Sequence, residues 1–258
     1  MRLRILASGS GGNAALLWAG DHLVLIDAGL PVRALSDRLR TSSIGLRAID
    51  HVLVSHGHLD HSRTAGIIAK RHEATLHCAN EIRNHRALAR ARDVRDLPID
   101  GSFFLDDAED VRVDSIRVPH DCDPTVAFRI ERDGRVLSFL TDMGEPRDDV
   151  ANRLCGAHVL VIEANHDATM LAEGDYPAPL KDRVKGPGGH LSNEQMAVML
   201  VRLAGPELHT VVLAHLSEHN NRPELAEAAA REALERIDRP DVRVLVARQS
   251  EPLDPLDV

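Results

Sequence analysis

The chain has 258 residues, of which 43 % are hydrophobic and 2 % are aromatic, and its formal net charge is −9. This length and apolar content can bury a substantial core, so we expect one domain spanning residues 1–258. The negative charge argues against binding of nucleic acid over a broad basic surface, and the scarcity of aromatic rings argues against an extended platform that stacks successive bases. Any contact with nucleic acid should therefore be local.

The three cysteines, Cys78, Cys122 and Cys155, lie far apart and form no CxxC pair. This spacing disfavours a disulfide framework or a cysteine zinc site, and it fits a reducing compartment. The N-terminal residues hold too few apolar positions for a signal peptide, and no apolar run approaches the ~20 residues of a membrane span. We therefore expect a soluble, cytoplasmic protein with no membrane contact. A homo-oligomer is compatible with the composition, and the sequence does not fix its size.

Predicted strands and helices alternate along the chain without low-complexity segments or long linkers. β-Branched and apolar runs predict strands at residues 3–7, 14–19, 22–27, 51–55, 74–78, 111–118, 125–131, 135–141, 158–163, 210–214 and 242–246. Apolar periodicity and capping residues predict helices at residues 32–40, 62–71, 81–90, 147–154, 193–203 and 224–237. This order indicates an α/β chain with mixed sheets, and the polar stretch between Arg90 and Val111 has no assignment.

Two glycine-containing segments predict turns. Asp133-Gly134 separates two apolar runs, which is typical of a β-hairpin. The segment Ser8-Gly9-Ser10-Gly11-Gly12-Asn13 lacks the GxGxxG spacing of a dinucleotide loop, and a strand-like run follows it where such a loop would have a helix. We therefore expect a tight turn beside the active site there.

The segment His56-Gly57-His58-Leu59-Asp60-His61 directly follows the apolar run 51–55 and carries four metal-binding side chains. Imidazole and carboxylate groups are ligands that zinc and similar divalent ions accept, and a loop at the end of a strand can aim several of them at one point. His56 and His58 can converge on one ion, whereas Asp60 and His61 more naturally reach a neighbouring ion about 3.5–4 Å away. The spacing predicts a binuclear site that needs further ligands from elsewhere.

Three more candidates stand where predicted strands end. His120, Asp142 and His215 each follow an apolar run at its passage into a loop, which is where rigid scaffolds present ligands. A lone histidine at such a place is more often a surface residue or a satisfied core residue. Because the chain also carries the HxHxDH segment, we expect these three residues to be metal ligands.

Taken in order, Asp27 in Leu25-Ile26-Asp27-Ala28-Gly29, the HGHLDH segment, His120, Asp142 and His215 resemble the successive motifs of the metallo-β-lactamase superfamily. Further segments make the chain similar to its YycJ/WalJ group of exonucleases, namely SGSGGN at 8–13, PHD at 119–121, EANHD at 163–167, GHLSN at 189–193 and AHLS at 214–217. The resemblance covers nearly the whole chain. It implies an αβ/βα four-layer sandwich with two mixed β-sheets, helices outside and a site along one edge.

The resemblance also implies a ligand set for two divalent ions, Zn²⁺ or Mn²⁺. It assigns His56, His58 and His120 to one ion, Asp60, His61 and His215 to the other, and Asp142 to a bridging position. It implies that Asp27 is a buried residue that orients the ligand loop; a polar residue that ends a strand is the alternative. Histidine and aspartate accept both metals, so the sequence does not choose between them.

The GHLSN segment begins a predicted helix with Ser192 or Asn193 as its cap, and a helix N-terminus with free amides is a ready phosphate site. A similar segment occurs in tRNase Z-type phosphodiesterases, where its histidine acts with a glutamate. This similarity implies that His190 is the general acid for the leaving oxygen and that Glu163 holds and charges its imidazole. With Asp60 they form the predicted catalytic set, and an ordinary helix cap is the alternative for GHLSN.

Three basic residues are candidates for further substrate contacts. Lys181 and Arg183 precede the GHLSN segment and could grip phosphates, while a solvated charge run is an equal alternative. His166 could touch substrate or stabilise its own turn, and nothing in the spacing decides between these roles.

The expected function is that of a binuclear metal-dependent phosphodiesterase, specifically a DNA exonuclease that works 5′-to-3′ by family resemblance, with a metal-bridging hydroxide as the nucleophile. DNA is favoured because no segment reads as an extra clamp for RNA. A thioester or lactam hydrolase is the first alternative, although the GHLSN helix start and Glu163 would have no obvious task in it. A non-catalytic metal-binding module is the second, and the full ligand set counts against it.

Overall fold

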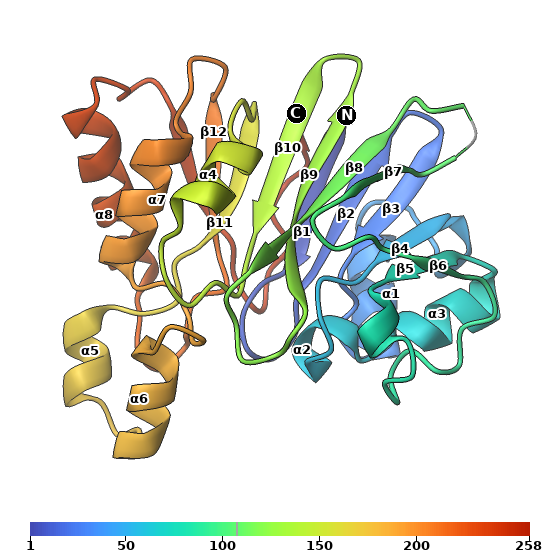
Figure 1. Cartoon of the computed structure of the whole chain (residues 1–258), viewed down its shortest axis with the longest axis horizontal. Helices are drawn as coiled ribbons and strands as arrows, with labels where there is room; N and C mark the ends of the chain where they lie inside the picture. Colours follow the sequence, from blue (N-terminus) through green and yellow to red (C-terminus); the bar gives the residue numbers. More distant parts are fainter. Residues whose placement is uncertain (107) are drawn as a thin grey trace.

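The computed structural model describes residues 1–106 and 108–258 and contains two β-sheets that pack face to face between helices (Figure 1). The first sheet consists of β14 (Leu256–Asp257), β1 (Arg2–Ala7), β2 (Ala14–Ala19), β3 (His22–Ile26), β4 (His51–Leu53), β5 (Thr75–Cys78) and β6 (Val94–Asp96), in that order. The second sheet consists of β13 (Arg243–Val246), β12 (Thr210–Ala214), β11 (Val159–Glu163), β10 (Arg135–Leu140), β9 (Thr125–Arg132), β8 (Arg112–Val118) and β7 (Ser102–Phe104), in that order.

Both sheets are mixed. In the first sheet, β14, β1, β2 and β3 pair antiparallel, and β3, β4, β5 and β6 pair parallel. In the second sheet, β7, β8, β9 and β10 pair antiparallel, and β10, β11, β12 and β13 pair parallel. Hairpins join most of the antiparallel strands, whereas the parallel strands need longer crossover connections.

Helices cover the outer face of each sheet. The helices are α1 (Val32–Arg40), α2 (Leu59–Ser62), α3 (Ala65–His72), α4 (Asp148–Leu154), α5 (Ala168–Glu173), α6 (Ala178–Lys185), α7 (Asn193–Leu203) and α8 (Pro223–Arg236). Figure 1 shows α1 and α3 against the first sheet and α4, α7 and α8 against the second. Within the described ranges, no helix is long and apolar enough to cross a membrane.

The alternation of side chains along β11 shows how the layers pack. Val159 and Val161 lie in the hydrophobic cluster between the two sheets, and Leu160 and Ile162 lie in the cluster beneath the outer helices of the second sheet. Successive side chains of a strand point to opposite faces, so a strand that is covered on both faces reads as a continuous apolar run. A third cluster, which includes Leu35, packs α1 and α3 onto the first sheet. These layers confirm the predicted αβ/βα sandwich.

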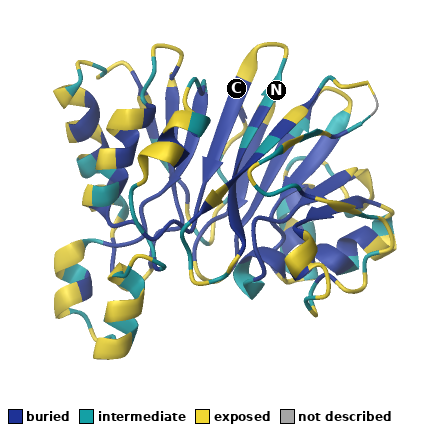
Figure 2. Ribbon diagram, viewed as in Figure 1, coloured by how far each residue is buried: buried dark blue, intermediate teal, exposed yellow. Residues whose placement is uncertain are grey.

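The helices α5 and α6 differ from the other helices because they project from the sandwich as a hairpin. Figure 2 shows that most of their surface is exposed. Leu171 is the buried residue of α5, and α6 has none. This hairpin therefore gains little stability from core burial, and most of its surface remains open to solvent.

The prediction of a helix at residues 81–90 is wrong. The structure has a 3₁₀ turn at Asn80–Ile82 followed by further turns. Ile82 and Leu88 are the buried large side chains of this stretch, and their spacing of six residues gives no continuous helical stripe. The backbone carbonyl of Ala87 instead accepts a hydrogen bond from Gly66 N at 3.1 Å, which ties the segment to the start of α3.

The expected helix at residues 62–71 is broken into two pieces. A single turn, α2, already includes part of the ligand segment, and α3 begins only at Ala65. The stretch after Arg90 contains the short edge strands β6 and β7, which were not predicted. Sequence patterns also missed α5, α6 and β14.

Both expected turns are present. Asp133 and Gly134 have φ angles of 51° and 71°, and they connect the antiparallel strands β9 and β10. Asp tolerates this left-handed conformation and glycine adopts it without strain, as a two-residue hairpin requires. The segment 8–13 connects β1 to β2, as a turn without a following helix.

Candidate metal centre

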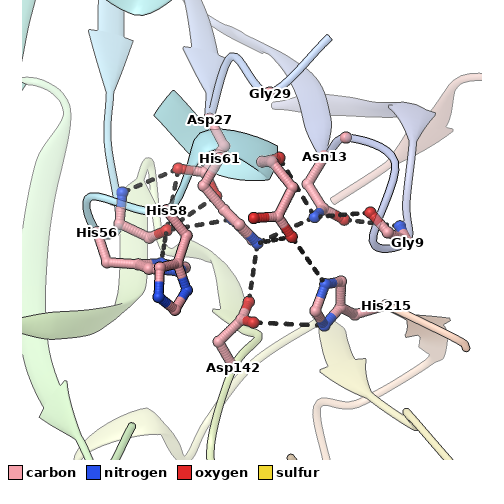
Figure 3. Close-up of polar contacts among 12 residues, drawn as sticks. Gly9, Asn13, Asp27, Gly29, His56, His58, His61, Asp142 and His215 are labelled. Carbon is pink, nitrogen blue, oxygen red and sulfur yellow. Dashed lines mark hydrogen bonds and ion pairs between the residues drawn. The ribbon is translucent and has the colours of Figure 1, made fainter. Parts of the chain in front are cut away.

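The predicted ligands gather at one edge of the sandwich, where strands from both sheets end (Figure 3). The loop after β4 carries His56 to His61. The loops after β8, β10 and β12 carry His120, Asp142 and His215. These strands end at the same edge, so their loops can present ligands to a common point.

The ligand atoms fall into two adjoining groups. Within each group, one ligand atom per residue lies within 4.8 Å of the others, and the groups are His56 with His58 and His120, and Asp60 with His61 and His215. Asp142 lies between them, with Oδ2 3.0 Å from His61 Nε2 and Oδ1 3.8 Å from His120 Nε2. Figure 3 shows the Asp142 carboxylate facing both His61 and His215. The structure therefore brings together all seven predicted ligands.

Outer acceptors hold most of the imidazole rings. The Nδ1 atom of His61 lies 2.6 Å from Asp27 Oδ2, that of His120 lies 3.0 Å from Gly189 O, and that of His215 lies 2.8 Å from Glu163 Oε1. Such a partner fixes the tautomer and leaves the second ring nitrogen free to bind a metal. Asp27 is almost fully buried, and its carboxylate contacts both Ser55 N and His61 Nδ1 of the ligand loop.

Several atoms that point into the centre have no hydrogen-bond partner among the described residues. They include His56 Nε2 and His215 Nε2, and both are buried. Burying a polar atom without a partner costs free energy, so such atoms are rare unless something else satisfies them. Two unpartnered imidazole nitrogens within one cluster fit the coordination of divalent ions by histidine.

The backbone is unusual at the strand ends. Asp27, Asp142 and His215 have φ angles of 58°, 57° and 55°, in the left-handed region. Asp and His tolerate this region better than most residues, and here it turns the chain sharply where each strand ends. Gly29 approaches the ligand loop so closely that an added Cβ would lie 1.6 Å from Asp60 O.

Carboxylates in the cluster raise the proton affinity of nearby imidazoles. Burial opposes protonation of His215, yet Asp142, Asp60 and Glu163 raise its pKa to about 10. Burial also opposes protonation of His61, and Asp142 is the first of the carboxylates that raise its pKa well above the ordinary value. The centre thus favours positive charge within it. Metal binding would supply that charge and release these protons.

Glu163 joins the metal centre to His190. This fully buried carboxylate has Oε1 at 2.8 Å from both His190 Nδ1 and His215 Nδ1, and its Oε2 accepts hydrogen bonds from Met143 N and Leu191 N at 3.1 Å. Burial alone would raise the pKa of Glu163, but His190 and the other donors lower it to about 2. His190 is therefore held by Nδ1, and its second ring nitrogen is available beside the metal centre.

A cavity of about 440 Å³ lies against this centre. Several metal-ligand candidates, His190 and Arg183 of α6 are among the residues that line it. Arg183 Nε donates to Asp121 Oδ2 at 2.5 Å. The Oδ1 atom of Asp121 lies 3.5 Å from His58 Nε2. An exposed arginine of the helical hairpin is thus linked through one carboxylate to a candidate metal ligand.

The other predicted substrate contacts lie outside that cavity lining. His166 and Lys181 line a neighbouring pocket of about 300 Å³, and Lys181 Nζ donates to Ala172 O at 2.7 Å. Ser192 caps α7 by accepting a hydrogen bond from Gln195 N. Asn193 is buried, and its side-chain amide forms a reciprocal pair with Asn221 at 2.9 and 3.0 Å.

Three residues of the site were not among the predicted ones. Asn13 Nδ2 lies 2.9 Å from His61 Nε2, Ser55 Oγ lies 3.0 Å from His56 Nδ1, and Asp121 faces His58. The sequence positions of these residues partly indicate a role in the site, because Asn13 ends the glycine-rich turn and the other two are adjacent to predicted ligands. Polar residues next to ligands are common, so only the fold shows which of them point inward.

The layered sheets and the histidine-rich edge define a metallo-β-lactamase fold. A family model described as a beta-lactamase superfamily domain matches residues 22–216, and the chain belongs to this family. Solved structures share the fold across 98 % of this chain. They include the metallo-beta-lactamase fold protein YhfI from Bacillus subtilis, with 16 % identity, 99 % of that chain covered and a TM-score of 0.72. Zn²⁺-bound PqqB from Methylobacterium extorquens is 19 % identical, with 100 % of that chain covered and a TM-score of 0.71.

Two relatives give a finer comparison. Exodeoxyribonuclease YycJ from Bacillus anthracis is 29 % identical over 240 residues, which cover 91 % of this chain and 89 % of that protein. Exodeoxyribonuclease WalJ from Streptococcus pneumoniae is 32 % identical over 227 residues, which cover 86 % of this chain and 84 % of that protein. The predicted resemblance to the YycJ/WalJ group is confirmed.

Proposed function

We propose that this metal-dependent hydrolase is a phosphodiesterase that degrades DNA from an end and holds two divalent ions. The relatives named exodeoxyribonuclease support the DNA substrate and the exonuclease mode. The observation that carries the chemistry is the contact of Glu163 with both His190 and His215 at 2.8 Å. One carboxylate thereby fixes a candidate metal ligand and a candidate proton donor in the same cavity.

The proposed ligands are His56, His58 and His120 for one ion, and Asp60, His61 and His215 for the other, with Asp142 shared. The two groups and their unpartnered nitrogen atoms support this assignment. When bound, two such ions supply a water of lowered pKa and neutralise charge on a phosphate. Zn²⁺ and Mn²⁺ both suit this set of nitrogen and oxygen donors.

The proposed role of His190 is to donate a proton to the leaving sugar oxygen. Glu163 accepts a hydrogen bond from Nδ1–H of His190, so the second ring nitrogen can carry the proton that is transferred. Asp27 and Glu163 act as positioning residues, because they orient His61 and His215 through the outer ring nitrogen. A thioester or lactam substrate would give the Glu163–His190 pair no comparable task.

The test is cleavage of single- and double-stranded DNA labelled at either end, after chelation and re-addition of Zn²⁺ or Mn²⁺. RNA and a glutathione thioester serve as competing substrates. We expect stepwise release of nucleotides from DNA, and the label released first gives the polarity, which family resemblance places as 5′-to-3′. Cleavage of the thioester alone would contradict the proposal. Two bound metals without cleavage of any substrate would contradict it as well.

Two variants separate the proposed roles. His58→Ala should lose one metal and activity together. His190→Ala should keep both metals and lose about 10²- to 10⁴-fold in turnover, the usual contribution of a positioned acid. Metal content by elemental analysis and kcat on labelled DNA measure both effects. Undiminished turnover in His190→Ala would remove that residue from the proton transfer.

A further inference from the structure

The α5–α6 hairpin contributes one wall of the cavity that the candidate metal ligands also line. Tyr176, Leu180, Arg183 and Val184 line it. Their spacing of three and four residues places them on one side of α6 and of the turn that leads into it. This side therefore presents three large apolar or aromatic groups and one cation to the cavity.

Neither the core nor the hydrolysis of a phosphodiester accounts for this wall. No residue of α6 is buried, so Leu180 and Val184 are not part of any described hydrophobic cluster. A phosphate that reacts at the metal centre needs charged and polar partners, which apolar side chains cannot provide. An apolar surface that faces a reactive polar centre instead fits the apolar part of a ligand.

Tyr176 is the most informative residue of the wall. It is the one tyrosine in a chain whose aromatic content is 2 %. Its ring is half-buried, and the ring of His219 lies 5.9 Å away at 58°, which braces one edge. Every nucleobase has a flat face that can stack on an aromatic ring. The cavity volume of about 440 Å³ lies in the range of sites for small ligands.

Arg183 adds an anion partner to the same wall. Its guanidinium is exposed at the cavity rim and is paired with Asp121. A guanidinium has five donors, so it can contact a phosphate oxygen while it keeps a bond to that carboxylate. The aromatic ring of Tyr176, just before α6, and the guanidinium of Arg183 on α6 line the same cavity and offer partners for the base and the phosphate of one nucleotide.

We propose that Tyr176 and Leu180 form a subsite for a single nucleobase, that of the nucleotide adjoining the scissile phosphate, and that Arg183 holds a phosphate of that nucleotide. This inference rests on the proposed function and specifies its substrate. One ring stacks one base, so the subsite recognises a strand end and provides no track along a strand. The stacking is tolerant of base identity because all four bases offer a π-face.

The experiment compares two DNA substrates that differ only in the terminal nucleotide, which is either natural or a stable abasic analogue. KM and kcat are measured for the metal-loaded wild type, Tyr176→Phe, Tyr176→Ala and the control Phe104→Ala. Phe104 is an exposed aromatic residue on β7 and does not line the cavity. Alanine substitution of a stacking ring typically weakens binding by roughly 5- to 150-fold per base.

We expect the wild type, Tyr176→Phe and Phe104→Ala to show a lower KM for the natural end than for the abasic end. In Tyr176→Ala this preference should shrink toward one, through KM and with little change in kcat. Equal KM values for both ends in the wild type would overturn the subsite while the nuclease function stands. So would an undiminished preference in Tyr176→Ala. Cleavage of neither substrate would overturn the function and the subsite together.

Discussion

Replacement of Glu163 by glutamine tests how the centre is held together. The carboxylate receives four donors, two imidazole N–H groups at Oε1 and two backbone N–H groups at Oε2. An amide has one oxygen, and its NH₂ group cannot accept a hydrogen bond. While both imidazoles keep the proton on Nδ1, two of the four donors face another donor in either orientation of the amide inside a fully buried site.

The cost follows from the loss of two hydrogen bonds at the oxygen that the amide NH₂ group replaces. A buried donor without a partner costs about 1–3 kcal/mol, so the Glu163→Gln variant should lose about 2–6 kcal/mol of unfolding free energy in the metal-free protein. This is a large share of the 5–15 kcal/mol that typical domains have. Turnover should fall by about 10²-fold or more, because His190 loses the acceptor that fixes its ring.

The assay is urea unfolding of the metal-free variant, followed by kcat on labelled DNA after metal is restored. Glu235→Gln is the matched control, since Glu235 is exposed on α8, and a surface change of this kind stays within about 0.5 kcal/mol. An unchanged unfolding midpoint and an unchanged kcat in Glu163→Gln would refute the view that this carboxylate orients the two rings.

Three further predictions concern acid stability, close packing and metal affinity. Burial lowers the pKa of His77 from its ordinary value of 6.5 to about 3. At a pH between these two values, the unfolded chain binds a proton at this residue that the folded chain does not bind. The free energy of unfolding should therefore fall by up to about 5 kcal/mol as the pH falls through this range. In His77→Gln, the midpoint of urea unfolding should depend less steeply on pH than in the wild type. Equal slopes for the two proteins would contradict this prediction. Gly29→Ala should cost more than about 3 kcal/mol in urea unfolding and disturb metal uptake, because its Cβ would meet Asp60 O, whereas Gly45→Ala has open space and should be near neutral. Asp121→Ala should weaken metal binding about 10- to 100-fold in competition with a chromophoric chelator, and unchanged affinity would show that Asp121 does not position His58.

The strands were the most predictable part of the fold. Residues 14–19 and 210–214 match β2 and β12 at both ends, because strands that are buried on both faces leave long apolar runs in the sequence. The hairpin of α5 and α6 was missed since it has almost no buried face and therefore no apolar stripe. Strand β14 has two residues, which is too short for any pattern.

The candidate site shows the same division. The ligand segment 56–61 is contiguous, so its chemistry can be read directly from the sequence. The link from Arg183 through Asp121 to His58 depends on the docking of a helix that no local pattern predicted. Tyr176 likewise gives no functional signal in the sequence, because only the fold places it in the lining of the cavity that the ligands share.

The left-handed backbone at Asp142 and His215 restricts how the metal preference of this scaffold could be redesigned. Thiolates would draw the centre toward softer ions, yet cysteine at either position would adopt a conformation that costs most L-residues about 1–2 kcal/mol. His58 has a φ of −58°, which any residue accepts. An engineered thiolate is therefore best introduced at position 58, and Asp142 and His215 are best left unchanged.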